Sequence, residues 1–121
     1  MFNNYMKYLV IFCMCIISFV AFGQIKNTDM KKDKPKNLTE CIQMLDKTLK
    51  KEDKEYIKTL TEDEFFMESH FTIGMGICNE WIRNGNPELV TFFLDQGVKH
   101  PDDMSAMILT SYYRHLTMFN V

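Results

Sequence analysis

The sequence lacks a surplus of positive charge: 14 lysines and arginines stand against 16 aspartates and glutamates, and the net charge is −2. It also lacks aromatic residues interleaved with basic ones. A protein that binds nucleic acid needs a basic surface to neutralise phosphates. We therefore expect no nucleic-acid partner.

Metal and nucleotide motifs are missing as well. The four cysteines form no CxxC pair and the three histidines stand far apart, so the sequence has no zinc-type ligand pattern. The Gly-x-Gly at Gly74 and Gly76 follows no predicted strand and has no third glycine, which argues against a phosphate-binding loop. We expect no cofactor and no metal.

The first 23 residues have the pattern of an export leader. Lys7 precedes an apolar run over Tyr8–Val20, and the small residues Ala21 and Gly23 follow. This order is typical of a signal peptide, and we expect cleavage between Gly23 and Gln24. The run is shorter than the roughly 20 residues of a bilayer-spanning helix. We therefore expect an exported, periplasmic or secreted product, and the leader resembles those of Gram-negative Bacteroidota.

An uncleaved membrane anchor is the alternative for this segment. Five lysines follow the apolar run and only Lys7 precedes it, whereas a translocated C-terminus normally has its positive charges before the run. Membrane contact is then expected through the leader only.

The remaining chain divides into a spacer and one domain. Residues 24–36 are rich in lysine, interrupted by Asp29 and Asp33, and this composition is typical of a flexible spacer. Residues 37–119 suffice for a single domain with one modest core. Apolar residues recur there at helical spacing. We predict an all-α domain, a compact orthogonal bundle of about five short helices with no sheet.

Polar residues mark where the predicted helices begin. Asn37 with Glu40, and Thr61 with Glu64, have the three-residue spacing of a capping box. In the passage 85–87, glycine suits a left-handed turn position, asparagine an N-cap and proline the first position of a helix.

The segment 70–83 is predicted to form a helix that buries Phe71 and Trp81. Gly74 and Gly76 each cost a helix about 1 kcal/mol relative to alanine, so we expect them to permit a close helix crossing. Trp81 is expected to anchor the core, with an exposed recognition residue as the alternative.

Two polar stretches form the candidate binding surface, one after the Trp81 helix and one at the start of the last helix. Loops between rigid helices often recognise partners, and arginine is enriched at binding hot spots. The candidate binding residues are Arg83, Asn84, Asn86, His100, Asp102 and Asp103.

The stretch from His100 also has two other interpretations. The first is helix punctuation, because acidic residues and proline favour a helix N-terminus and His100 could cap it. The second is a small metal-dependent hydrolase, since a histidine and two acids can bind a divalent cation with help from a second histidine. That site would use His100, Asp102, Asp103 and either His70 or His115.

Cys41 and Cys78 remain after leader removal, and their state is open. In an oxidising compartment they could pair, which would stabilise the domain by about 4 kcal/mol on the chain-entropy model. Both also lie on apolar helix faces, where a free cysteine packs as a small hydrophobe.

Two segments, GMGICNEWIRN over residues 74–84 and HPDDMSAMIL over residues 100–109, resemble an uncharacterised bacterial family of small helical domains. The resemblance covers about Pro35 to Leu116. It implies a short helical domain, found alone or behind an export leader, and it implies no activity.

The function predicted from these observations is a non-catalytic module that binds a protein or an envelope component. The sequence contains no nucleophile elbow and no glycine-rich oxyanion loop. We therefore expect that the chain is not an enzyme, with the metal-dependent hydrolase as the alternative.

Overall fold

Helices make up the part of the chain that the computed structural model describes, residues 27–118, and these residues contain no strand. The predicted all-α fold is confirmed for them. The expected leader and its cleavage point lie outside the described residues. None of the helices within 27–118 is long and apolar enough to cross a bilayer. The elements are α2 (Asn27–Lys32), α3 (Leu38–Thr48), α4 (Lys51–Thr59), α5 (Glu62–Ser69), η1 (His70–Gly74), η2 (Ile77–Arg83), α6 (Pro87–Asp95) and α7 (Pro101–Met118).

The helices α3 and α5 begin at the positions that the two capping pairs predicted, and local hydrogen bonds stabilise both starts. Asn37 Oδ1 accepts a hydrogen bond of 2.9 Å from the Glu40 backbone N–H. Thr61 and Glu64 form a complete capping box, each side chain accepting from the other's backbone N–H at 3.2 and 3.1 Å. These bonds satisfy donors that the first turn of a helix otherwise leaves unpaired.

The turn before α6 is confirmed in two of its three predicted features. Asn86 caps the helix, with its Oδ1 accepting from the Glu88 backbone N–H at 3.0 Å, and Pro87 takes the first helical position. The left-handed conformation predicted for Gly85 is wrong, because among the described glycines only Gly97, which follows α6, has a positive φ, of 83°. Gly85 is needed for space, since a Cβ there would lie 2.0 Å from the Trp81 carbonyl oxygen.

The elements α5, η1 and η2 form one continuous helix, which we call the long helix. The joining residues His70, Met75 and Gly76 all have right-handed helical backbone angles. The sequence had suggested two separate helices here. The two η stretches are π-helical, a wider winding with i→i+5 hydrogen bonds.

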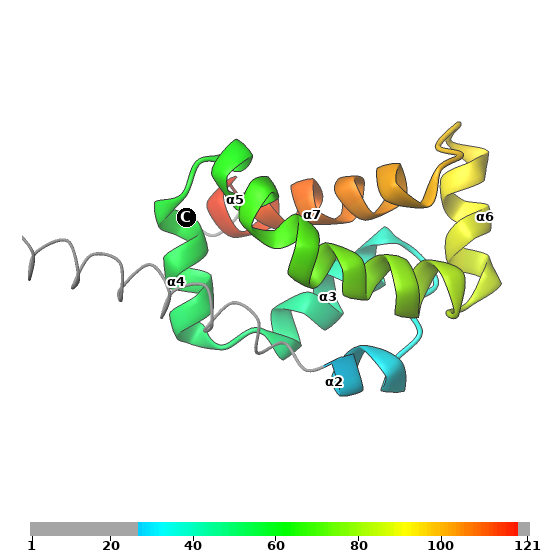
Figure 1. The fold of residues 1–121 in the computed structure, drawn as a ribbon, viewed down its shortest axis with the longest axis horizontal. Coiled ribbons are helices and arrows are strands. Elements are labelled where there is room, and N and C mark those ends of the chain that lie inside the picture. Colours follow the sequence, from blue (N-terminus) through cyan, green and yellow to red (C-terminus); the bar gives the residue numbers. More distant parts are fainter. Residues whose placement is uncertain (1–26, 119–121) are drawn as a thin grey trace, which may run out of the picture.

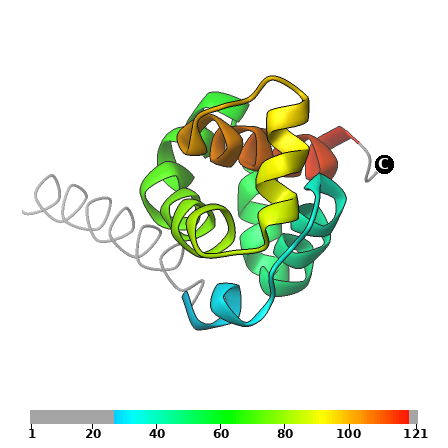
Figure 2. The same cartoon turned by 90° about the vertical axis from the view of Figure 1, so that its right-hand side faces the viewer.

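The long helix and α7 pack against each other, and α7 also contacts α3 and α4 (Figure 1). α6 runs across one end of this bundle (Figure 2). α7 buries six side chains and is the central element of the core. The largest fully buried side chains of the described core are Trp81, Tyr112, Phe65 and Phe93.

The described part of the segment expected to be a flexible spacer, residues 27–36, contacts the long helix. Met30 of α2 is only 3% exposed, and its carbonyl oxygen accepts a hydrogen bond of 3.1 Å from Trp81 Nε1. Lys34 Nζ donates to the Glu80 carbonyl oxygen at 2.9 Å. A buried indole N–H needs an acceptor, and α2 supplies one. Trp81, 2% exposed, is thus the core anchor that the sequence favoured.

Candidate functional site

The buried side of the long helix follows a spacing of four. Phe65, Ser69, Ile73, Ile77 and Trp81 are all buried, and we call them the buried row. In a regular α-helix of about 3.6 residues per turn, such a row would rotate by about 160° from its first to its last member. The row stays on one side because the π-helical stretches turn less per residue.

The opposite side of the long helix is exposed. Its residues lie two positions before or after members of the buried row. Every fourth residue there faces solvent, and we call this set the exposed row: Asp63, Met67, Phe71, Met75, Asn79 and Arg83. Its middle is apolar, because Met67 is 70%, Phe71 72% and Met75 50% exposed. The prediction that Phe71 is buried is therefore wrong: it assumed α-helical winding, and the π-helical winding turns this position outward.

A small open pocket lies between the exposed row and α7, and we call it the side pocket. Its volume is about 150 Å³. That volume matches a cavity that holds one benzene ring, whereas small-molecule sites occupy about 300–1,000 Å³. The side pocket therefore has room for one apolar side chain of a partner. Its walls are His70, Phe71, Gly74, Met75, Cys78, Asn79 and Arg83 from the long helix, and Asp102 and Ser105 from α7.

The long helix and α7 pack closely at the side pocket, where Gly74 and Ser105 are two of the walls. Ser105 Oγ donates to the Gly74 carbonyl oxygen at 2.9 Å. A Cβ at Gly74 would lie 3.3 Å from Leu109 Cδ1, so the predicted close helix crossing at Gly74 is confirmed. Two other walls of the pocket, His70 and Phe71, contact each other edge to face, with their ring centroids 4.9 Å apart.

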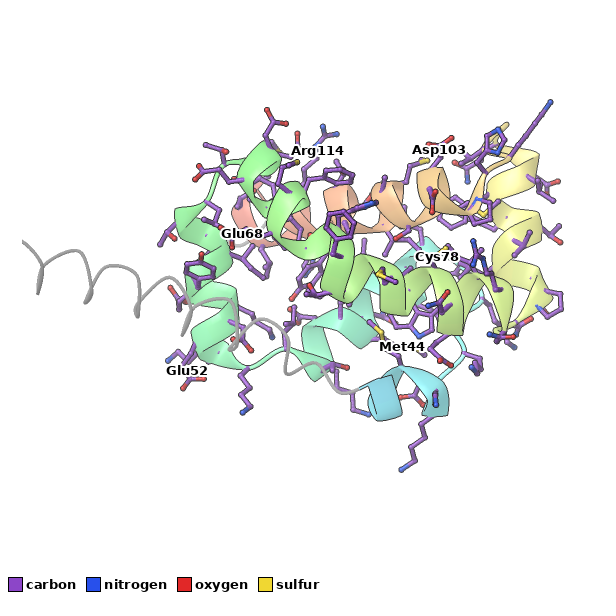
Figure 3. All side chains as sticks on the ribbon, in the orientation of Figure 1. Met44, Glu52, Glu68, Cys78, Asp103 and Arg114 are labelled. Atoms are coloured by element: carbon purple, nitrogen blue, oxygen red, sulfur yellow. The ribbon has the colours of Figure 1, made fainter. Side chains whose placement is uncertain are left out.

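Cys78 is the only thiol among the pocket walls (Figure 3). Its Sγ lies 3.8 Å from Asp102 Oδ1. Burial raises the pKa of this thiol most, Arg83 lowers it through its positive charge, and the negative charge and hydrogen bond of Asp102 raise it further. The reactive form of cysteine is the thiolate, so this environment keeps Cys78 in its poorly reactive form.

The structure brings two of the six predicted binding residues to the side pocket, Arg83 and Asp102. The exposed Asp103 lies on the first turn of α7 (Figure 3) but does not line the pocket. The other three residues shape helix ends. Asn84 Nδ2 donates to the Asn79 carbonyl oxygen at 2.9 Å, Asn86 caps α6, and the His100 carbonyl oxygen accepts from the Met104 N–H at 3.0 Å.

The alternative metal site finds no support in residues 27–118, where no three His, Cys, Asp or Glu side chains gather to hold an ion. His70 lies at the side pocket, while His115 stacks on Tyr112, with ring centroids 6.2 Å apart. The possible disulfide is not formed either. Cys41 and Cys78 are both buried free thiols, one packed in the core and the other beside Asp102.

Sequence reasoning missed most of the pocket walls. Phe71 and Cys78 were expected to pack on apolar helix faces, and Met75, Asn79 and Ser105 were not among the predicted site residues. The signal was present as a spacing of four along residues 63–83, which fits neither the 3.6-residue period of an α-helix nor a strand.

Comparison with known proteins identifies the family of this chain. No curated protein and no solved structure matches the chain. One family does: the family described as "Domain of unknown function (DUF6794)" matches residues 34–116. This span lies close to the Pro35–Leu116 over which the sequence resembled an uncharacterised small domain. Because the match covers well over half of the chain, the chain belongs to the DUF6794 family.

Proposed function

We propose that this chain is a non-catalytic binding module that docks another protein through the exposed row and the side pocket. The observation behind the proposal is the exposure of Met67, Phe71 and Met75 on one helix face. Contiguous exposed apolar side chains rimmed by polar ones are typical of interaction sites. Methionines add a surface that adapts to a partner's shape.

The size and chemistry of the side pocket favour binding over catalysis. Its volume of about 150 Å³ fits a single anchoring side chain, and such pockets hold the hot-spot residues of an interface. Burial and Asp102 raise the pKa of the Cys78 thiol, which disfavours a nucleophilic role. No observation on residues 27–118 supports the metal-dependent hydrolase.

The binding role is tested by site-specific photocrosslinking in the cell that makes the protein. A photoreactive phenylalanine analogue at position 71 should give a discrete adduct with a protein. The same analogue at Gln43, an exposed position on α3, is the matched control and should give none. Substituting Met67→Asp and Met75→Asp together should abolish the adduct from position 71 with helical content unchanged. If position 71 gives no adduct, or no more than position 43, the proposal is wrong.

Export is part of the proposal and rests on the leader pattern. N-terminal sequencing of the protein recovered outside the cytoplasm should begin at Gln24, because Ala21 and Gly23 are the small residues that a signal peptidase requires. Recovery in the membrane fraction with the N-terminus of the full chain would favour the uncleaved anchor instead.

A further inference from the structure

The two ends of the exposed row have opposite charges, Asp63 at one end and Arg83 at the other. Asp63 stands near the start of the long helix and Arg83 at its end. Both side chains are exposed, and neither takes part in a salt bridge among the described residues. Other charged residues of the same bundle do pair, as Arg114 does with Glu62 at 2.8 Å. The row therefore offers one carboxylate and one guanidinium that are not engaged in a salt bridge among the described residues.

The order of residues along the row makes it complementary to itself. When two copies of the row lie antiparallel, Asp63 faces Arg83 of the partner subunit, and Phe71 faces Met75 of the partner subunit. The remaining positions, Met67 and Asn79, also face each other. A two-fold interface requires such self-complementarity, because each contact occurs twice with the roles exchanged.

We propose that a second copy of this chain is the partner, paired antiparallel along the exposed row about a two-fold axis. This inference rests on the proposed function and names the occupant of that same surface. The apolar middle of the row is buried by its counterpart, with two contacts between a methionine sulfur and a phenylalanine ring, which are favourable. The two charged pairs at the rim set the register and orientation.

The size of the row sets the strength that we expect. A stable interface buries about 800 Å² on each partner, and a single helix face with three large apolar side chains offers less. We therefore expect a reversible dimer with a dissociation constant in the micromolar range.

Charge reversal tests the pairing directly. In sedimentation equilibrium of the processed, exported chain, Asp63→Arg alone and Arg83→Asp alone should each weaken dimerisation at least about tenfold, because like charges then meet at both ends. An equimolar mixture of the two variants should recover dimers, since every Arg then faces an Asp. Asp95→Arg, on an exposed residue at the end of α6, is the matched control and should dimerise normally.

Each other outcome overturns the inference. This pairing is excluded if the chain stays monomeric up to about 1 mM. It is also excluded if neither charge reversal weakens the dimer, or if the mixture of the two variants does not recover it. If the photoreactive group at position 71 captures a different protein while the chain is monomeric, the second copy is wrong and the binding function stands. If position 71 captures nothing, the proposed function itself fails.

Discussion

At the residue scale, Gly85 differs from the usual glycine at a helix end. Its φ is not positive, so a side chain would not be excluded by backbone conformation. What excludes it is contact, because a Cβ would lie 2.0 Å from the oxygen and 2.6 Å from the carbon of the Trp81 carbonyl. The turn into α6 therefore requires glycine for the approach of two backbone segments.

We predict that Gly85→Ala lowers the free energy of unfolding by about 3 kcal/mol, the upper end of the overpacking range, because backbone must move. Gly97→Ala is the matched control. At φ 83° with nothing within 4 Å of its Cβ, it should cost only the left-handed penalty, about 1–2 kcal/mol. Urea denaturation followed by circular dichroism measures both values. If both variants lost the same free energy of unfolding, the contact between a Cβ at Gly85 and the Trp81 carbonyl would not be the cause.

The Cys78 thiol reports on the charges of the side pocket. Asp102 raises its pKa and Arg83 lowers it, on top of the larger effect of burial. At a pH below that pKa, Asp102→Asn should increase the thiolate fraction and speed alkylation by iodoacetamide several-fold. Arg83→Gln should slow it, and peptide mass spectrometry separates Cys78 from Cys41. A shift in the same direction for both variants would show that the two charges do not act on this thiol as described.

At the element scale, the winding of the long helix decides which side chains are available for binding. The capping box at Thr61 and Glu64 starts this helix locally, so its start could be predicted from a four-residue pattern. Its π-helical continuation could not, because a wider helix is stable only where packing compensates for it. Gly74 against Leu109 and Ser105 is part of that packing.

The docking of α2 is likewise decided by tertiary contacts, and it predicts a local effect of a core substitution. Trp81→Phe removes the hydrogen bond to the Met30 carbonyl oxygen. Amide hydrogen exchange over residues 30–36 should then accelerate more than in the rest of the domain. Phe93→Leu changes a fully buried side chain on α6 and is the control. It should not accelerate amide exchange over residues 30–36 more than elsewhere. Uniform acceleration in both variants would mean that Trp81 does not hold α2.

At the scale of the whole molecule, one buried thiol links stability to alkaline pH. Cys41 lies on α3 and is fully buried in the hydrophobic core. Burial is the main cause that raises its pKa from 9.0 to about 12, and the charge of Glu40 adds to it. The folded state therefore keeps this proton after the unfolded state has lost it. The stability that this difference provides is fully present below pH 9.0 and is lost as the pH rises towards about 12.

We predict that Cys41→Ala is less stable than the parent chain at pH 8, because of the small cavity, and that the difference shrinks above pH 9.0. The parent should lose up to about 1.4 kcal/mol more per pH unit than the variant. Urea midpoints measured from pH 8 to 11 give both curves. If the stabilities of the parent chain and the variant fell in parallel with pH, Cys41 would not be the source of the alkaline pH dependence.

The sequence by itself determined the all-α class, the capped starts of α3, α5 and α6, and the family over residues 34–116. These features depend on hydrogen bonds and periodicities within a few residues, which a local pattern encodes.

Only the tertiary structure decided which face of the long helix is exposed, that α2 packs on Trp81, and that Cys78 meets Asp102 from 24 positions away. The physical reason is that contact with α7 and α2, and not local propensity, selects the winding and the partners of the long helix. The exposed row and side pocket, on which the proposed binding depends, follow from that packing.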